Sequence, residues 1–219
     1  MDMVMDMDME VITVIKMKIL TAKRNRYSRK TNKSYIFFMQ IIHTHIEGLL
    51  VIQPNVFEDA RGYFFESYNK QLFLNNGIDV EFVQDNQSLS QNGVLRGLHL
   101  QKPPHAQGKL VRVIKGSVLD VAVDIRKNSN TYGKHFSIEL NEKNKTMLWI
   151  PTGFAHGFLT IKDDTIFSYK CTDVYNKASE DTIYWNDADI GINWGVENPT
   201  LSEKDKKGKK FADFKSPFY

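Results

Sequence analysis

Two histidines, a lysine and an acidic residue fall in stretches of this sequence that otherwise have the composition of buried strands. His99 and His156 each end an apolar, glycine-containing segment. Lys109 opens one apolar run, and Asp120 interrupts another. An imidazole takes up and releases protons near neutral pH, and a fixed ammonium group stabilises a developing negative charge. These residue types predict chemistry in which protons are moved.

Asp120 needs a partner, because it lies within the apolar run Val118-Leu-Asp-Val-Ala-Val. Burial of a carboxylate that has neither an ion-pair partner nor hydrogen bonds is strongly unfavourable. His156 is the candidate partner, since a neighbouring carboxylate fixes the tautomer of an imidazole and raises its basicity. A lone histidine in a strand is more often a packed core residue than a catalyst. Two histidines at related positions, with buried charges near them, favour a shared site.

The elements that must position these groups are short β-strands. The candidates are rich in β-branched and aromatic residues, are bounded by Gly, Pro, Asn and Asp, and cover residues 49–53, 62–67, 80–86, 94–101, 109–116, 118–124, 136–140, 146–150, 156–161 and 165–171. Two short helices are expected, one at 69–75, closed by Gly77, and one after Ser202. Many short strands with few helices predict an all-β fold, either an antiparallel sandwich or a small barrel with peripheral helices.

The two histidine segments resemble the paired motifs of cupin jelly rolls. The first is Gly93-Val-Leu-Arg-Gly-Leu-His99, and the second is Pro151-Thr-Gly-Phe-Ala-His156. In that fold the strands of the two motifs face each other across a barrel. The resemblance therefore implies a cupin-type jelly roll in which His99 and His156 approach one another inside the barrel.

Many cupins hold a metal ion with an H-x-H pair, a glutamate and a third histidine. Here the pair is broken, since the sequence reads His99-Leu-Gln101, and no acidic residue follows closely. His105 lies beyond two prolines in an expected loop. Two imidazoles fall short of the three protein ligands usual for a catalytic metal ion. We therefore expect neither a metal ion nor another cofactor.

The first 38 residues differ from the rest of the chain. Eight basic and four acidic residues fall there, which leaves residues 39–219 with a net charge of −1 out of the chain's +3. A nucleic-acid-binding domain would carry its basic patch in the folded part, so this class is not expected. Acidic residues precede the apolar run at 11–20, unlike in a secretory signal, and this run is too short to span a bilayer.

We expect residues 1–38 to be a disordered or non-native extension, with Met39 as the hypothetical natural start. A basic arm that touches an anionic surface is the less favoured interpretation. Residues 39–219 are expected to form one domain. The single cysteine, Cys171, excludes an internal disulfide and fits a reducing compartment, which predicts a cytoplasmic location.

An ordered series of motifs from about Gly48 to about Asp205 is similar to the dTDP-4-dehydrorhamnose 3,5-epimerases, a cofactor-independent family of sugar-nucleotide epimerases. The landmarks are Phe57-Glu-Asp-Ala-Arg-Gly-Tyr-Phe-Phe-Glu66, Phe82-Val-Gln-Asp-Asn-Gln-Ser88, Val94-Leu-Arg-Gly-Leu-His99, Gly108-Lys-Leu-Val-Arg112, Asp120-Val-Ala-Val-Asp124, Ile150-Pro-Thr-Gly-Phe-Ala-His-Gly-Phe158, Tyr169-Lys170 and Leu201-Ser-Glu-Lys-Asp205. The resemblance implies a homodimeric isomerase that inverts C3 and C5 of dTDP-4-dehydro-6-deoxy-D-glucose in dTDP-rhamnose biosynthesis.

The resemblance also implies a role for each matched residue. His99 would remove the proton beside the ketone, with Asp205 orienting it. Tyr169 would return a proton from the opposite face, and Lys109 would stabilise the enolate oxygen. His156, with Asp120 behind it, would contact the sugar. Tyr175 would stack on thymine, Phe57 and Phe64 would line the pocket, and residues 61–66 would reach the partner's site. The remaining matched residues would hold the nucleotide or sugar: Arg61, Glu66, Gln84, Asp85, Asn86, Arg96, Glu180 and Lys204.

Several positions also have simpler interpretations. Asp205 lies three residues after Ser202, as in a helix capping box. Arg61 could be a solvated turn residue, and Tyr169 and Tyr175 could be ordinary strand and loop aromatics. Arg96 and His99 would point to opposite faces of a regular strand, although both are assigned to one site. Either a bulge near Gly97 re-aims one of them, or Arg96 reaches the site from the end of the strand.

Alternative functions remain at this point. One is epimerisation at a single carbon, or keto-isomerisation, of a dTDP-linked keto-deoxysugar. Another is a metal-dependent cupin oxygenase, and a third is a non-catalytic sugar-binding cupin. The expected partners are a dTDP-linked keto-deoxysugar and a second copy of the chain, with no nucleic acid and no membrane.

Overall fold

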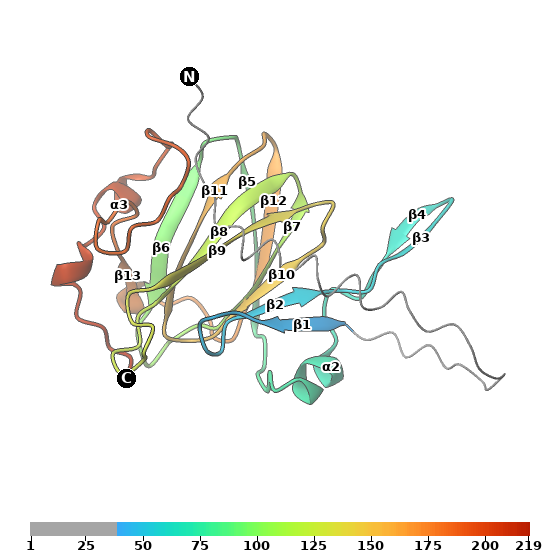
Figure 1. Ribbon diagram of the computed structural model, residues 1–219, viewed down its shortest axis with the longest axis horizontal. Helices are drawn as coiled ribbons and strands as arrows, with labels where there is room; N and C mark the ends of the chain where they lie inside the picture. The colour runs from blue at the N-terminus through green and yellow to red at the C-terminus, as the bar shows by residue number, and fades with distance from the viewer. Residues whose placement is uncertain (1–38) are drawn as a thin grey trace, which may run out of the picture. The chain divides into compact units, whose positions relative to one another are not determined.

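A computed structural model describes residues 39–219, and two antiparallel β-sheets form the framework of that range (Figure 1). The extension expected at 1–38 lies outside the described residues. The six-stranded sheet has the order β1-β2-β10-β7-β12-β5, and the five-stranded sheet has the order β13-β6-β11-β8-β9. The strands are β1 Gln40–His43, β2 Leu50–Gln53, β3 Phe57–Asp59, β4 Gly62–Phe64, β5 Gln84–Ser90, β6 Leu95–Gln101, β7 Lys109–Lys115, β8 Ser117–Asp124, β9 His135–Asn141, β10 Met147–Ile150, β11 Phe154–Thr160, β12 Thr165–Cys171 and β13 Glu180–Thr182.

The space between the two sheets is filled by side chains from both. Val111 of β7 and Phe167 of β12 come from the six-stranded sheet, while Ala122 of β8 and Phe158 of β11 come from the five-stranded sheet, and all four belong to one buried cluster. Successive side chains of a strand point to opposite faces of its sheet, so the inward-facing side chains of the two sheets together form such a layer. This arrangement confirms the predicted antiparallel jelly roll.

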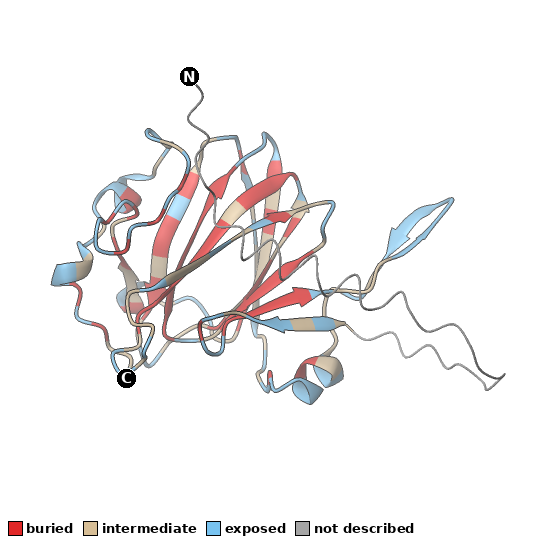
Figure 2. Ribbon diagram, viewed as in Figure 1, coloured by how far each residue is buried: buried red, intermediate tan, exposed pale blue. Residues whose placement is uncertain are grey.

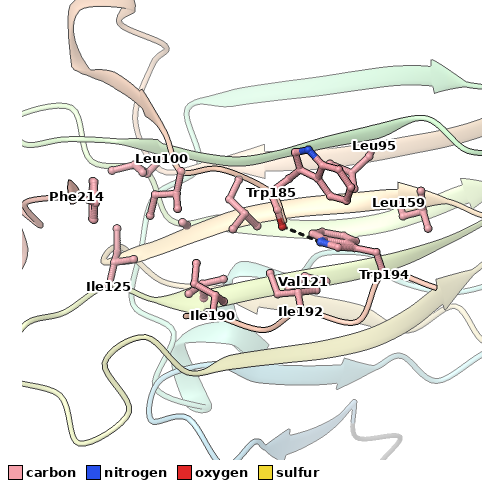
Figure 3. Close-up of a cluster of buried hydrophobic side chains, with 14 residues drawn as sticks. Leu95, Leu100, Val121, Ile125, Leu159, Trp185, Ile190, Ile192, Trp194 and Phe214 are labelled. Carbon is pink, nitrogen blue, oxygen red and sulfur yellow. Dashed lines mark hydrogen bonds between the residues drawn. The ribbon is translucent and has the colours of Figure 1, made fainter. Parts of the chain in front are cut away.

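Each sheet also has an apolar outer face that another part of the chain covers. On the five-stranded sheet, Leu95 and Leu100 pack with Trp185 and Trp194 of the C-terminal segment, and Trp194 Nε1 donates a hydrogen bond of 2.9 Å to the Trp185 carbonyl (Figure 3). On the six-stranded sheet, Trp149 and its neighbours pack against Phe73. Part of each outer face is therefore covered, and the central strands are largely buried in Figure 2.

The two predicted helices are present, and the second has the predicted N-cap, Ser202. Helix α2 spans Lys70–Asn75, and its N-cap Asn69 accepts a hydrogen bond from the amide of Leu72. Helix α3 spans Glu203–Lys206 after the N-cap Ser202. Two 3₁₀ turns, η2 Lys177–Ser179 and η3 Phe211–Asp213, complete the elements. Within 39–219, every helix is too short and too polar to cross a membrane.

Some predicted strand bounds were wrong. The strand expected at 80–86 begins only at Gln84 and continues to Ser90, where it pairs with β12. Phe82 lies before this ladder and packs edge-on against Tyr68 and Trp149, so aromatic contacts fix that stretch instead of strand pairing. The strand expected at 62–67 ends at Phe64. Three short strands were not predicted: β1, β3 and β13.

Candidate active site

Five strands bring the predicted proton-moving groups into the interior of the jelly roll. His99 on β6 and His156 on β11 are direct cross-strand partners, so the expected approach of the two histidines is confirmed. Strand β8, which carries Asp120, pairs with the other edge of β11. Lys109 and Tyr169 come from β7 and β12 of the facing sheet. The interior therefore holds an acid, two imidazoles, an ammonium group and a phenol.

A β-bulge in β6 explains how Arg96 and His99 serve one face. Opposite β11, Arg96 pairs with Phe158 and His99 pairs with His156, so two residues of β6 face a single residue of β11. Gly97 lies in this bulge with φ of +151°, and a Cβ there would lie 2.5 Å from the Cα of Gly157. Only glycine fits this close approach. Of the two predicted explanations, the bulge is confirmed.

The bulge keeps the leucines of β6 on the outer face. Leu95 and Leu98 both belong to the cluster under the C-terminal segment. Arg96 turns the other way, where its Nε donates to Ser90 Oγ at 3.2 Å. Its positive charge also opposes the increase that burial causes in the pKa of Tyr169.

His99 forms a close pair with Asp205 of helix α3. The distance from His99 Nε2 to Asp205 Oδ1 is 2.5 Å, and Ser202 Oγ donates to Asp205 Oδ2 at 2.8 Å. The amide of Asp205 donates to the same Ser202 hydroxyl at 3.2 Å. The capping interpretation and the site interpretation of Asp205 therefore hold together, because the cap that starts α3 also fixes the carboxylate beside His99.

Burial sets the protonation state of His99. Loss of solvation lowers its pKa below the ordinary 6.5, although the hydrogen bond and charge of Asp205 oppose that change. Burial acts to raise the pKa of Asp205, but the hydrogen bonds from His99 and Ser202, together with the nearby positive charges, outweigh burial and lower that pKa. At neutral pH the pair is therefore a neutral imidazole and an ionised carboxylate. An imidazole in that state can accept a proton.

His156 and Asp120 form the second pair, as predicted. His156 Nε2 lies 3.1 and 3.0 Å from the two oxygens of Asp120, and both side chains are buried. The imidazole also stacks on Phe167, with 6.2 Å between ring centroids. Because the two residues come from adjacent strands of one sheet, this pair is part of the wall of the barrel.

Lys109 and Tyr169 face these histidines from the other sheet. Lys109 Nζ lies 6.0 Å from the centre of the Tyr169 ring. Loss of solvation lowers the pKa of Lys109 and raises the pKa of Tyr169. The phenol therefore keeps its proton at neutral pH and can act as a proton donor. The ammonium group of Lys109 is close enough that its charge helps to lower the pKa of His99, and the charge of Asp120 raises the pKa of Lys109 against the effect of burial.

A second group of predicted residues gathers at one end of the barrel, around β13 and the loop after β12. Lys204 Nζ lies 2.7 Å from Glu180 Oε1, and the Tyr175 hydroxyl donates to Glu180 Oε2 at 3.4 Å. Gln84 Oε1 accepts a hydrogen bond of 2.8 Å from the Tyr175 amide, and Gln84 Nε2 donates to Asn86 Oδ1 at 3.1 Å. These contacts link the five residues into one polar group.

Four predicted residues lie apart from this group in the single chain. The exposed hairpin β3–β4 and the residues after it carry Phe57, Arg61, Phe64 and Glu66 (Figure 2). Arg61 pairs with Asp59 of its own turn. The other three line a hollow of about 240 Å³ together with α2 residues. The structure therefore gathers the hairpin residues with one another and not with His99.

Asp85 also lies apart from the inner groups. It alternates with Gln84 and Asn86 along β5, and its exposed carboxylate accepts from Lys170 Nζ at 3.0 Å. The period of two in a strand places its side chain on the outer face of the sheet.

Two residues beside the predicted groups had no predicted role. Cys171 lies next to Lys109 across the β7–β12 ladder, and Asn86 Nδ2 lies 3.6 Å from its sulfur. Gln101 was singled out only because it breaks the H-x-H pattern. Its side chain bonds only to backbone atoms of the loops beside the site, and its position two residues after His99 was the available signal that it lies near them.

The part of the chain that the structure describes contains no group of three or more His, Cys, Asp or Glu side chains arranged to hold a metal ion. His99 and His156 are each paired with one carboxylate instead. That the site works without a metal ion or another cofactor stays a prediction.

Comparison with known proteins finds one family over most of the chain. The family described as dTDP-4-dehydrorhamnose 3,5-epimerase matches residues 43–213. A curated protein of that name from Shigella flexneri is 53% identical over 176 residues, which cover 80% of this chain and 97% of the relative. Another of that name, from Methanothermobacter thermautotrophicus, is 48% identical over 183 residues, with coverages of 82% and 97%.

The solved structures agree with these sequence matches. The dTDP-6-deoxy-D-glucose-3,5-epimerase of Legionella pneumophila, solved with dTDP-4-keto-L-rhamnose, superposes with a TM-score of 0.80 at 45% identity. The match covers 83% of this chain and 98% of that structure.

Proposed function

The chain belongs to the dTDP-4-dehydrorhamnose 3,5-epimerase family, and from this premise we propose that it inverts C3 and C5 of dTDP-4-dehydro-6-deoxy-D-glucose, which gives dTDP-4-dehydro-L-rhamnose. It is thus an isomerase of dTDP-rhamnose synthesis. The observation that carries the residue roles is the neutral imidazole of His99, paired with the carboxylate of Asp205 and facing an un-ionised phenol and an ammonium group inside one barrel.

The reaction starts with removal of a proton from a carbon beside the ketone. Such a C–H bond is weakly acidic because the electron pair that it leaves is shared with the carbonyl oxygen. We assign the base to His99, whose neutral imidazole has a pKa below 6.5. When it takes the proton, Asp205 stabilises the resulting imidazolium.

Negative charge then develops on the ketone oxygen. We assign Lys109 to this oxygen, because its ammonium group projects into the interior near His99. In a site with little water, a fixed positive group stabilises the enolate more than it stabilises the ketone. Removal of one such group from other enzymes costs about 2.7–4 kcal/mol of barrier.

Inversion requires that a second group return the proton to the opposite face of the carbon. We assign this step to Tyr169, which comes from the facing sheet and keeps its proton because burial raises its pKa. The enolate collapses to the ketone as the new C–H bond forms. His99 then carries one extra proton and Tyr169 lacks one, and exchange with water resets both.

The remaining inner residues would hold the substrate. The His156–Asp120 pair is placed to contact the sugar, because it is fixed beside His99. An arginine forms two parallel bonds to phosphate oxygens, which suits Arg96 to the diphosphate. Glu180, Lys204, Gln84 and Asn86 line the approach. Tyr175 is 52% exposed and can stack on the thymine ring.

The hairpin residues and Asp85 would act in a homodimer. Phe57 and Phe64 are 44% and 65% exposed, which is unusual for two large aromatic side chains on one ribbon. We propose that the hairpin inserts into the partner's site, where Arg61, Glu66 and the two rings would contact the nucleotide. Asp85 would hold substrate only with help from that partner, since it lies on an outer face.

A cytoplasmic location is the last part of the proposal. Cys171 is a buried free thiol, which supports a reducing compartment.

The test is incubation of the purified protein with dTDP-4-dehydro-6-deoxy-D-glucose in deuterated water, followed by NMR of the product. We expect deuterium at both C3 and C5 and the L-rhamno configuration. Deuterium at one carbon alone would contradict double epimerisation and favour the single-centre alternative. Unlabelled, unchanged sugar would contradict the proposed epimerase activity itself.

A further inference from the structure

The loop between β12 and η2 carries Tyr175, and side chains from two other strands hold its backbone. The amide of Tyr175 donates to Gln84 Oε1 of β5 at 2.8 Å. The residues on both sides of Tyr175 are held by Gln101 of β6. Because β5 and β6 belong to different sheets, the loop is tied across the edge of the jelly roll.

Gln101 makes three hydrogen bonds with one amide group. Its Oε1 accepts from the backbone N–H of Asn176 at 2.7 Å. Its Nε2 donates to the carbonyl of Val174 at 3.3 Å and to the carbonyl of His105 at 3.0 Å. One side chain therefore binds the residue before Tyr175, the residue after it and the facing loop.

The three bonds need an amide at this position. A carboxamide has one oxygen acceptor and two N–H donors, and all of them are used in directions that the backbone sets. Gln101 is 7% exposed, so water cannot easily replace a lost bond. A glutamate of the same shape would place an acceptor against the Val174 and His105 carbonyls.

We propose that Gln101 is a positioning residue that fixes Tyr175 for recognition of the planar base of the nucleotide. The inference rests on the proposed stacking role of Tyr175. All three bonds of the Gln101 side chain go to backbone atoms of the loops, and none goes to a group assigned to proton transfer. Its effect therefore falls on the affinity for the base and not on proton transfer at His99 or Tyr169.

The variants Gln101→Glu and Gln101→Met test this proposal. Glutamate keeps the shape but loses both donors, and methionine removes all three bonds without adding charge. For each we expect KM for the dTDP-sugar to rise about tenfold, with kcat within about twofold of wild type. The Kd for dTDP should rise by the same factor, whereas the Kd for inorganic pyrophosphate, which lacks a base, should not change. For Gln101→Met, which adds no charge near His99, the shape of the pH profile should also stay the same.

The matched control is Gln91→Glu. Gln91 also bonds through its amide to another segment, but it lies on the surface away from Tyr175. Its dTDP affinity should equal that of wild type. If both Gln101 variants bind dTDP as tightly as wild type, or lose dTDP and pyrophosphate binding equally, the positioning role is overturned.

A double-mutant cycle separates this inference from the proposed function. If Gln101 acts through Tyr175, the variant Gln101→Glu/Tyr175→Ala should bind dTDP no more weakly than Tyr175→Ala alone. Additive losses would overturn the positioning role. If Tyr175→Ala leaves dTDP affinity unchanged, the stacking role in the proposed function fails, and the inference fails with it. If Tyr175→Ala weakens binding but the Gln101 variants do not, only the inference fails.

Discussion

The two histidine–aspartate pairs of the barrel use the same residue types but differ in origin and burial. His156 and Asp120 come from adjacent strands of one sheet, and their side chains are 7% and 0% exposed. His99 lies on β6, but its partner Asp205 comes from the four-residue helix α3, and the His99 side chain is 26% exposed. One pair is therefore part of the barrel wall, and the other joins the wall to a peripheral helix.

This difference separates structural and proton-moving roles. The His156–Asp120 pair is buried and lies on two adjacent strands, so it is well suited to fix the shape of the pocket. A catalytic base must exchange its proton with water after each turnover, which the more exposed His99 can do. The comparison predicts that changes to the His99 pair reduce turnover, while changes to the His156 pair chiefly reduce stability.

The largest expected effect is that of His99→Ala. Removal of the base should lower kcat by about 10³-fold or more, because general-base catalysis alone contributes up to about 10⁴. The affinity for dTDP, measured by calorimetry, should stay within a few-fold of wild type, since the nucleotide contacts lie elsewhere. Retained turnover would show that the imidazole of His99 is not the base.

Asp205→Asn should sharpen the comparison through its pH dependence. Burial lowers the pKa of His99, and Asp205 opposes this change, so loss of its charge lowers the pKa of His99 further. For wild type, kcat/KM should fall as the pH decreases through a pKa below 6.5. In the variant this acid limb should move to lower pH, and the plateau should drop by about 30-fold, since the imidazolium loses a charged hydrogen bond. An acid limb that moves upward would contradict the assignment.

Asp120→Asn should reduce stability more than it reduces turnover. The substitution weakens a fully buried pair and leaves an amide against His156, so the free energy of unfolding should fall by about 2 kcal/mol. Thermal unfolding measures this loss, with Asp205→Asn as the matched control, which should lose less because α3 is peripheral. Equal losses in both variants would remove the distinction between the pairs.

The smallest effect is expected in the hairpin. Phe64→Ala should raise KM by about threefold to tenfold and leave kcat nearly unchanged, because the ring would contact the partner's nucleotide and not the reacting carbons. Steady-state kinetics with a check of the dimer by light scattering measures this. A kcat loss as large as that of Asp205→Asn would mean that the hairpin takes part in the chemistry.

The sequence predicted the barrel groups well for a physical reason. His99, His156 and Asp120 lie in apolar strands, where burial forces polar groups to find partners. The predicted strands failed where side-chain packing replaced strand pairing, as at Phe82, or where a strand is only three residues long, as for the acidic β13.

Other features depend on contacts that no local pattern encodes. The bulge at Gly97 follows from the close approach of Gly157, a residue 60 positions away. The three bonds of Gln101 join segments that meet only in the folded chain. The outward direction of Asp85, in contrast, could have been predicted from its alternation with Gln84 and Asn86.

The central claim is that a base and a proton donor lie on opposite sides of the sugar ring. A crystal structure of the protein with a dTDP-linked 6-deoxysugar bound tests it directly. The account predicts that the imidazole of His99 and the hydroxyl of Tyr169 lie against opposite faces of the ring, each within reach of a carbon beside C4. Placement of both groups on one face, or of either far from the sugar, would contradict it.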